Sequence, residues 1–491
     1  MWSKARKNLS LLTVTSILCV MLAACGDGGG GTASTATVGQ TGGDQPTTAP
    51  TTAGATETTA PVGEETVAAT PAGDATPAGD ATQPAGGGDM TLPEGCSNVE
   101  LSYWNPFTGP DGPFMGEMVE AFNGDNENVK VTMTTQADYY TQIQTAAASD
   151  TLPDVAIIHA DQVATWAFRN VLRPIDDVVT ATGLSEGDYP EAVWAMGEVA
   201  GKRYSIPLDI HFMTMFYNAD LLTAAGINEP LINREEFEAA AQAVTDKGQK
   251  GFMVTAGFPI QQIFSMLLYQ NGGSWFNEDG TKATWNSDAG VQALTWLKDA
   301  QTKWSEPNLE VDAELAAFKA GGAGMIWNGI WQTTNVTGEG VSFKGEAAPV
   351  PQLGTTPATW AGSHQFTLPV HKAGADECKD AAAGMFIKYM VDNSVTWAQA
   401  GQIPANNDVR ESAEFKALPQ AVLAESAEAA FFPAVVPGIT DAFQYLDTAV
   451  GTVMSGKETD IKKALDDAAA QADQKLAENK ETFGDAPSGT P

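Results

Sequence analysis

The alternation of strand-like and helix-like segments after residue 96 constrains the fold of this 491-residue chain more than any other feature. The spacing of apolar residues predicts, in order, a strand, a helix, a strand, a helix and a strand, at 99–104, 113–123, 129–134, 139–149 and 153–158. The last strand is a continuous apolar run, which is typical of a parallel sheet covered on both faces. This β-α-β-α-β order predicts a layered α/β domain.

Residues 26–95, in contrast, cannot build a core. They are dominated by Gly, Ala, Thr, Pro and Asp and contain no Lys, Arg or aromatic residue. Such a composition buries too little apolar area to offset the conformational entropy of the chain, so the sequence predicts a disordered tether over 25–95. A flexible coil of about 70 residues has a reach of about 45 Å, which suits a spacer.

The first 25 residues have the pattern of an export signal. Three basic residues precede an apolar run over 9–22 that is too short for an ordinary membrane span, and two alanines then precede Cys25. This pattern resembles the lipobox of bacterial lipoproteins, which implies a signal peptide at 1–24 and a lipid on the sulfur of Cys25. The alternative is a plain secretory signal with an incidental cysteine. In both cases the mature protein is exported.

The four cysteines fit this destination. Cys19 would lie in the signal peptide and Cys25 would carry the lipid, which leaves Cys96 and Cys378. Two thiols in an oxidising compartment pair more often than they stay free, so we expect a disulfide between them, with free thiols as the alternative. No cysteine spacing resembles a zinc or redox site.

Charge and motifs argue against several classes of function. The formal net charge is −35, which disfavours nucleic-acid binding because phosphates require basic patches. The sequence contains no Gly-x-Ser-x-Gly elbow, no phosphate-binding P-loop and no His-Glu-x-x-His helix. We therefore predict no enzyme activity, no catalytic residue and no cofactor, and keep a secreted carbohydrate-active enzyme only as an alternative.

Several short runs follow one another in a characteristic order. They are Tyr103-Trp104, Phe122-Asn123, Leu152-Pro153-Asp154-Val155, Leu172-Arg173-Pro174-Ile175, 201–207, 216–222, 324–331 and 401–405. Each run alone is unspecific. Their order across residues 98–480 resembles the extracellular solute-binding proteins, the sugar-capturing receptors of ABC importers of the maltose-binding-protein type.

The resemblance implies an α/β fold with two lobes, the type II-like periplasmic-binding-protein fold, in which a ligand cleft lies between the lobes and the chain crosses several hinges. The crossings are expected near 207–211, 361–368 and 404–432. The expected divisions are 96–208 plus 366–405 for lobe 1, 209–364 plus 406–480 for lobe 2, and 481–491 for a disordered tail. This layout places Cys96 and Cys378 in the same lobe.

The same resemblance implies a receptor that captures a carbohydrate by cleft closure and delivers it to the membrane subunits of an ABC permease. It would act as a monomer on the extracytoplasmic face of the bacterial cell membrane, held there by the lipid on Cys25. A binding protein for a non-sugar solute is the main alternative. A surface adhesin would explain the tether but not the ordered motifs.

Candidate ligand contacts are planar polar side chains beside aromatic rings, because sugar hydroxyls form hydrogen bonds while sugar C–H faces stack on rings. Trp104 and Asn105 end the first predicted strand, at the edge of a sheet where ligands usually bind. Asp161 follows the last strand of the β-α-β-α-β segment. The alternatives are a core position for Trp104 and a helix N-cap for Asp161.

Polar residues also mark the first two crossings. Asp209 and His211 alternate with apolar residues, which places them on one face of a strand. A zinc site would need further ligands that the local sequence does not supply, so we predict no metal, and a hydrogen-bonded hinge pair is the alternative to ligand contact. At the second crossing, His364 and Gln365 are polar side chains that we expect to contact the ligand. The alternative is a hinge that makes no ligand contact.

Two tryptophans flank a glycine in the segment Trp327-Asn328-Gly329-Ile330-Trp331. The segment resembles the family's Asn-Gly-x-Trp run, which implies that an aromatic ring projects toward the ligand, and Gly329 allows close approach of the backbone. Both tryptophans are candidates. We favour Trp331 over Trp327, because one of the pair is expected to pack in the core.

Overall fold

The structure, a computed structural model, describes residues 90–228, 231–433 and 435–484. All of them belong to one compact unit. The predicted signal peptide, the lipid site at Cys25, nearly all of the tether and the end of the tail lie outside the described residues.

The first sheet contains the predicted β-α-β-α-β segment, and its strands lie in the order β2-β1-β3-β12-β6. The bounds are β1 Val99–Asn105, α1 Gly112–Asp125, β2 Val129–Thr135, α2 Tyr139–Ser149, β3 Val155–His159, β6 Ser205–Pro207 and β12 His364–Thr367. β1 runs parallel to β2 and β3, as the sequence predicts. β12 enters antiparallel between β3 and β6, and it brings a distant part of the chain into this sheet.

The second sheet is built around β7 (Asp209–Asn218), in which all ten residues are buried. Its strand order is β14-β11-β7-β9-β8, and β10 and β13 also pair with β7. The bounds are β8 Lys250–Met253, β9 Ala323–Gly329, β10 Gly345–Pro349, β11 Thr359–Gly362, β13 Ile403–Pro404 and β14 Ala430–Phe431. A separate two-stranded ladder joins β4 (Glu198–Val199) to β5 (Lys202–Arg203).

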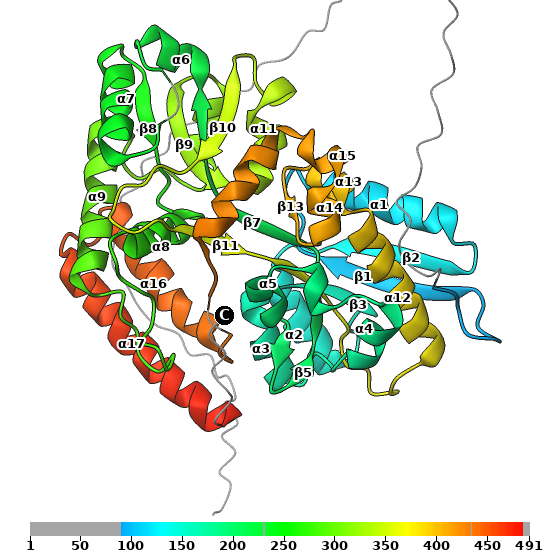
Figure 1. Ribbon diagram of the computed structural model, residues 1–491. Coiled ribbons are helices and arrows are strands. Elements are labelled where there is room, and N and C mark those ends of the chain that lie inside the picture. The colour runs from blue at the N-terminus through cyan, green and yellow to red at the C-terminus, as the bar shows by residue number, and fades with distance from the viewer. Residues whose placement is uncertain (1–89, 229–230, 434, 485–491) are drawn as a thin grey trace, which may run out of the picture. The chain divides into compact units, whose positions relative to one another are not determined.

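Helices pack around both sheets (Figure 1). Those near the first sheet are α3 Ala160–Phe168, α4 Asp176–Thr182, η1 Glu186–Asp188, α5 Glu191–Ala195, α12 Glu377–Asp392, α13 Ser394–Ala398, α14 Asn407–Glu411 and α15 Ala413–Lys416. The others are α6 Ala219–Ala224, α7 Arg234–Asp246, α8 Ile260–Gln270, α9 Asp288–Trp304, α10 Ala313–Lys319, η2 Ile330–Gln332, α11 Thr333–Val336, η3 Gly338–Gly340, η4 Pro419–Ala429, α16 Ile439–Met454 and α17 Ile461–Phe483. Within the described ranges, none of these helices combines the length and the apolar character needed to cross a bilayer.

The chain changes sheets at crossings, as the fold prediction requires. β6 of the first sheet leads directly into β7 of the second, and β11 of the second leads directly into β12 of the first. β7 contributes to the packing of both sheets, because Ile210 and Phe212 lie in the main core of the first sheet and Met213 and Met215 in the main core of the second. The two-lobed α/β architecture is confirmed.

Packing divides one predicted segment between the two cores. The sequence assigns 406–480 as a whole to lobe 2, yet Phe415 and Leu423 are buried in the core of the first sheet. α15 lies against α13, so the chain after β13 first follows the first core, and α16 and α17 then enter the second. The lobe boundaries themselves stay a prediction.

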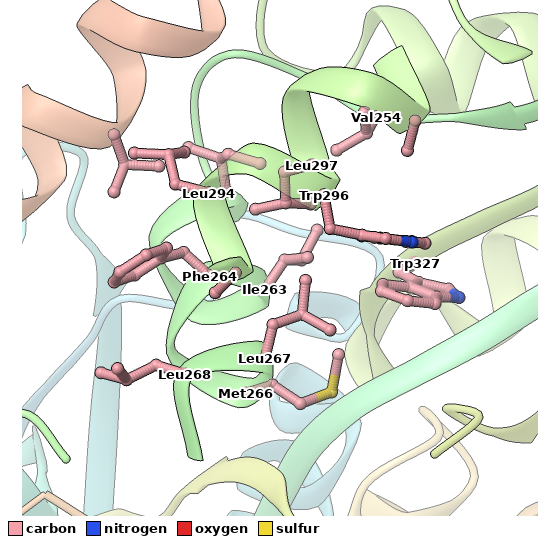
Figure 2. Packing of buried hydrophobic residues seen from close by; sticks show 14 of the residues in the cluster. Val254, Ile263, Phe264, Met266, Leu267, Leu268, Leu294, Trp296, Leu297 and Trp327 are labelled. Atoms are coloured by element: carbon pink, nitrogen blue, oxygen red, sulfur yellow. The ribbon is translucent and has the colours of Figure 1, made fainter. Parts of the chain in front are cut away.

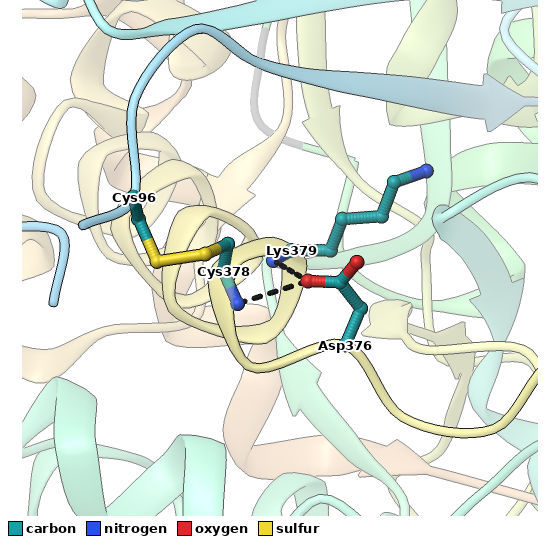
Figure 3. The surroundings of a disulfide bond; sticks show 4 residues. All are labelled: Cys96, Asp376, Cys378 and Lys379. Atoms are coloured by element: carbon teal, nitrogen blue, oxygen red, sulfur yellow. Dashed lines mark hydrogen bonds between the residues drawn. A yellow bond between two sulfur atoms is a disulfide. The ribbon is translucent and has the colours of Figure 1, made fainter.

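A disulfide joins Cys96 to Cys378, as we expected (Figure 3). Cys96 lies shortly before β1 and Cys378 lies in the first turn of α12, with their Cα atoms 5.5 Å apart. Asp376 caps the same helix by accepting hydrogen bonds from the backbone N–H groups of Cys378 and Lys379, at 3.0 and 3.1 Å. The bridge therefore fixes the start of the described chain to a capped helix 282 residues later.

Candidate functional site

A cavity of about 630 Å³ lies between α3 beside the first sheet and several elements of the second. Its walls come from the first turn of α3, the loop before α8, α8, β11 and one face of α16. The aromatic, amide, carboxyl and hydroxyl side chains that line it are Phe258, Trp275, Trp360, Phe443; Gln162, Gln261, Gln262, Gln444; Asp161, Asp447; and Thr440, Thr448, Thr452, Ser455. The volume is typical of a small-molecule site.

Contacts between the two cores adjoin this cavity. The hydroxyl of Thr440 on α16 donates to the side-chain oxygen of Gln162 on α3, at 3.1 Å. The guanidinium group of Arg169, the residue directly after α3, pairs with the carboxylate of Asp441 on α16 at 3.0 Å. Both sides of the cavity are therefore held together by polar contacts that can be broken and remade.

Asp161 lines the cavity from the first turn of α3, where the positive end of the helix dipole favours a negative charge. The helix begins at Ala160 with His159 as its N-cap residue, so Asp161 is not the N-cap that the alternative interpretation proposed. Burial raises the pKa of Asp161 to about 6, although hydrogen bonds from backbone groups lower it. The carboxylate is ionised at neutral pH and can accept hydrogen bonds from a ligand.

The structure separates the two tryptophans around Gly329. Trp327 is 1% exposed and stacks on Trp296 in the second core, with ring centroids 5.6 Å apart (Figure 2), so core packing removes it from the candidate site. Trp331 is half-buried, and its ring centroid lies 5.9 Å from that of Phe258, which lines the cavity. A Cβ atom on Gly329 would stand 2.0 Å from the Trp331 ring, so the glycine allows the indole to lie there.

Three further predicted contacts lie outside the cavity lining. Trp104 is half-buried and packs against the core cluster near α2 and α3. The side-chain oxygen of Asn105 accepts a hydrogen bond from the hydroxyl of Thr135 at 3.1 Å, and that of Gln365 accepts one from the hydroxyl of Ser205 at 2.8 Å. Asn105 and Gln365 are fully buried and connect neighbouring strands, which is a structural role, and their contact with a ligand stays a prediction.

Asp209 is fully buried at the start of β7 and accepts four hydrogen bonds. The donors are the backbone N–H and Nδ1 of His364 at 2.9 and 2.7 Å, Nδ1 of His211 at 3.2 Å, and Nε1 of Trp397 at 2.7 Å. Burial alone would raise the pKa of Asp209, but the interactions with His364 and His211 hold it well below its usual range. Asp209 and His211 are therefore hydrogen-bonded to each other at the first crossing, and His364 joins them from the second. Contact of these three residues with a ligand stays a prediction.

Sequence reasoning missed α16, which supplies much of the cavity wall. Thr440, Gln444, Thr448 and Thr452 recur every four residues, so they lie on one face of this helix, and all four line the cavity. This four-residue spacing was the sequence feature that could have indicated a polar helix face at the site. A polar helix face more often meets solvent, and the sequence alone does not show which polar face meets a cavity.

Comparison with known proteins agrees with the fold. A family model described as bacterial extracellular solute-binding protein matches residues 117–423, more than half of the chain. The chain belongs to this family. Extracellular solute-binding proteins are binding proteins rather than enzymes, and they act outside the cytoplasm.

Individual relatives have low sequence identity to this chain but align with it over long segments. The arabinooligosaccharide-binding protein of Bacillus subtilis is 25% identical over 338 residues, which cover 65% of this chain and 76% of that protein. The maltotriose-binding protein of Pyrococcus abyssi is 21% identical over 326 residues, covering 65% and 70%. The structure of an ABC substrate-binding protein from Listeria monocytogenes in complex with cycloalternan has a TM-score of 0.67 at 24% identity, covering 77% of this chain and 99% of that one. This likeness supports the solute-binding-protein fold.

Proposed function

We propose that this solute-binding protein captures a neutral carbohydrate in the cavity beside α3 and α16 and delivers it to the membrane subunits of an ABC permease. The observation that carries the proposal is the mixture of aromatic rings and planar amides around one cavity. Sugar C–H faces stack on such rings, and an amide pairs with hydroxyls as donor and acceptor at once. The relatives named for arabinooligosaccharide and maltotriose support the same class of ligand.

The charge of the lining supports a neutral ligand. Asp161 and Asp447 supply carboxylates, and Lys457 is the single cationic side chain among the lining residues that the structure describes. A sugar acid or a sugar phosphate would meet an excess of negative charge there. The hydroxyls of a neutral sugar instead donate to the carboxylates, and such charge-assisted hydrogen bonds are strong.

Capture would proceed by closure, because the lining comes from both cores. Asp161 and Gln162 belong to α3, whereas Trp360 and Gln444 belong to β11 and α16. A sugar that contacts the residues of α3 as well as those of β11 and α16 can form all of these contacts only when the two sides of the cavity approach each other. Its binding energy therefore shifts the population toward the closed arrangement.

We also propose that the protein works as a monomer on the extracytoplasmic face of the membrane, anchored by a lipid on Cys25 and lifted by the tether. The support is the residue pattern before Cys25 together with the extracellular family. Cys25→Ser should release the protein into the medium, and mass spectrometry of the N-terminal peptide of the wild type should find an acylated cysteine. A wild-type protein that starts at another residue without a lipid would refute the anchor.

A thermal-shift screen of neutral mono- and oligosaccharides against the mature protein tests the ligand class. A sugar at one hundred times its dissociation constant stabilises the native state by about 2.7 kcal/mol, which raises Tm by a few degrees. A response to amino acids or metal chelates, with no response to any sugar, would identify a non-sugar solute. Turnover of a bound glycan would favour the enzyme alternative instead.

A further inference from the structure

Three of the four histidines of the chain come together at the hinge, outside the cavity lining. His159 ends β3, His211 lies near the start of β7, and His364 begins β12. One ring nitrogen from each lies within 4.8 Å of the others, and the ring centroids are 4.3, 4.8 and 6.0 Å apart. We propose that these three imidazoles bind a divalent transition-metal ion, with zinc as the expected occupant.

Strand register brings the three side chains to one place. β12 pairs antiparallel with β3 so that His364 lies directly opposite His159. β11 pairs antiparallel with β7 so that His211 lies opposite Gly362, two residues before His364. A Cβ atom on Gly362 would stand 2.5 Å from Nε2 of His211, so the absence of a side chain there leaves room for the ring. The two crossings between the sheets thus fix the cluster.

One nitrogen of each ring forms a hydrogen bond, and we infer that the metal binds the other nitrogen of each ring. The ionised carboxylate of Asp209 can only accept, so Nδ1 of His211 and Nδ1 of His364 both donate to it, at 3.2 and 2.7 Å. Nδ1 of His159 pairs with the hydroxyl of Tyr140 at 2.5 Å. In the part of the chain that the structure describes, no hydrogen bond reaches Nε2 of any of the three. Such partners behind a histidine fix its tautomer and orientation in metal sites.

The charges around the cluster favour a cation. His211 and His364 are buried, and His159 is half-buried. Asp209 and Asp111 are buried carboxylates that interact with His364, and neither pairs with a Lys or Arg among the described residues.

The donor set and its spacing select the kind of ion. Three neutral imidazoles suit zinc and its first-row neighbours, whereas calcium and magnesium prefer oxygen ligands. Zinc–nitrogen bonds of about 2.0 Å in a tetrahedral site need nitrogens about 3.3 Å apart, so atoms now up to 4.8 Å apart must close by about 1.5 Å. His159 is half-buried, which leaves the cluster within reach of an ion, and a fourth position remains for water.

Zinc titration of the mature, tag-free protein after chelator treatment tests the proposal. We expect one zinc ion per chain in competition with a chromophoric chelator, and cobalt should give the visible absorption bands of a tetrahedral ion. His159→Gln leaves the hydrogen bonds of Asp209 in place and should weaken zinc binding by more than about 100-fold, and Tyr140→Phe by about tenfold. His371→Gln changes the fourth histidine, outside the cluster, and should leave zinc binding unchanged.

The proposal is overturned if the wild type takes up no zinc, or if His159→Gln binds zinc as tightly as the wild type. It is also overturned if His371→Gln, rather than His159→Gln, abolishes binding. Circular dichroism and Tm should confirm that each variant is folded. If His159→Gln fails to fold, Tyr140→Phe decides, because unchanged zinc affinity and an unchanged cobalt spectrum in that variant would reject His159 as a ligand. Sugar affinity is measured separately, so failure of the zinc site does not bear on the carbohydrate proposal.

Discussion

At the scale of single residues, the carboxyl group of Asp161 links pH to ligand capture. The ionised carboxylate forms stronger, charge-assisted hydrogen bonds with sugar hydroxyls than the protonated carboxyl group does, and with a pKa of about 6 it is ionised in about one molecule in ten at pH 5. Sugar affinity should therefore fall about tenfold between pH 7.5 and pH 5, as pH drops through this pKa. Asp161→Asn should bind more weakly at pH 7.5 and lose this pH dependence. Isothermal titration at both pH values checks this, and a flat wild-type profile would contradict it.

Gly329 is predicted to position Trp331. A Cβ atom at Gly329 would overlap the indole ring at 2.0 Å, so Gly329→Ala should push the ring away from Phe258 and destabilise the fold by about 1–3 kcal/mol. Denaturant unfolding and tryptophan fluorescence measure the two effects. Gly124→Ala, on α1, is a suitable control, because nothing lies within 4 Å of the point that its Cβ atom would occupy. Equal unfolding curves for the two variants would argue against this role.

Some of these residue-level features follow from local sequence and others do not. The shared face of Asp209 and His211 follows from their spacing on one strand. His159 and His364 join them only through the register of strands that are distant in sequence, which no local pattern determines. The different surroundings of Trp327 and Trp331 were also predicted in outline, because one of the pair was expected to pack in the core, while contact of Trp331 with a ligand stays a prediction.

At the scale of elements, the contact between α10 and β9 contains a carboxyl group that costs stability when ionised. Burial raises the pKa of Glu314 to about 7, and its side chain accepts one hydrogen bond, from Asn328 at 3.2 Å. The folded state therefore binds this proton more tightly than the unfolded state, so the stability it contributes is present below about pH 4.5 and is lost as pH rises through 7.

Glu314→Gln should remove this penalty. We expect the variant to be more stable than the wild type by about 1–3 kcal/mol at pH 8, and nearly equal to it at pH 5. Urea unfolding at the two pH values measures the difference. Glu310→Gln, at an exposed position four residues earlier, should change neither value. A stabilisation by Glu314→Gln that is the same at both pH values would contradict the assignment.

Elements with a strong apolar period were the most predictable. The five segments of the β-α-β-α-β unit match the observed elements to within about two residues, since each has a clear period of 2 or 3.6. The short strands β6, β11, β13 and β14 carry too few residues for a period to emerge. Their existence depends on pairing with distant partners, and three of them pair with β7 or with β11 in the second sheet.

At the scale of the whole molecule, the disulfide is predicted to stabilise the fold substantially. In the chain-entropy model, a bridge that closes a loop of 282 residues lowers the conformational entropy of the unfolded state. This raises the free energy of that state by up to about 5 kcal/mol. The double variant Cys96→Ser and Cys378→Ser should lose about 2–5 kcal/mol in denaturant unfolding. Reductant should destabilise the wild type to a similar extent and leave the double variant unaffected. Equal stability of the oxidised wild type and the double variant would contradict this prediction.

The two-lobed architecture was predictable from the order of motifs, because that order follows the family rather than any single period. The allocation of 406–432 was not, since Phe415 and Leu423 lie in short elements whose apolar residues fit either core. The cavity was not predictable for the same reason. It forms where α3, β11 and α16 meet, and these elements lie far apart in the sequence.

Calorimetric titration of the most stabilising sugar from the thermal-shift screen tests the central claim most directly. We predict one binding site per chain in the wild type, and at least tenfold weaker binding for Phe258→Ala and Gln444→Ala, whose side chains line the cavity. Gln471→Ala, an exposed glutamine on α17, should bind as the wild type does. Carbohydrate binding that is unchanged in both cavity variants, or the absence of binding by any neutral carbohydrate, would contradict the proposed site.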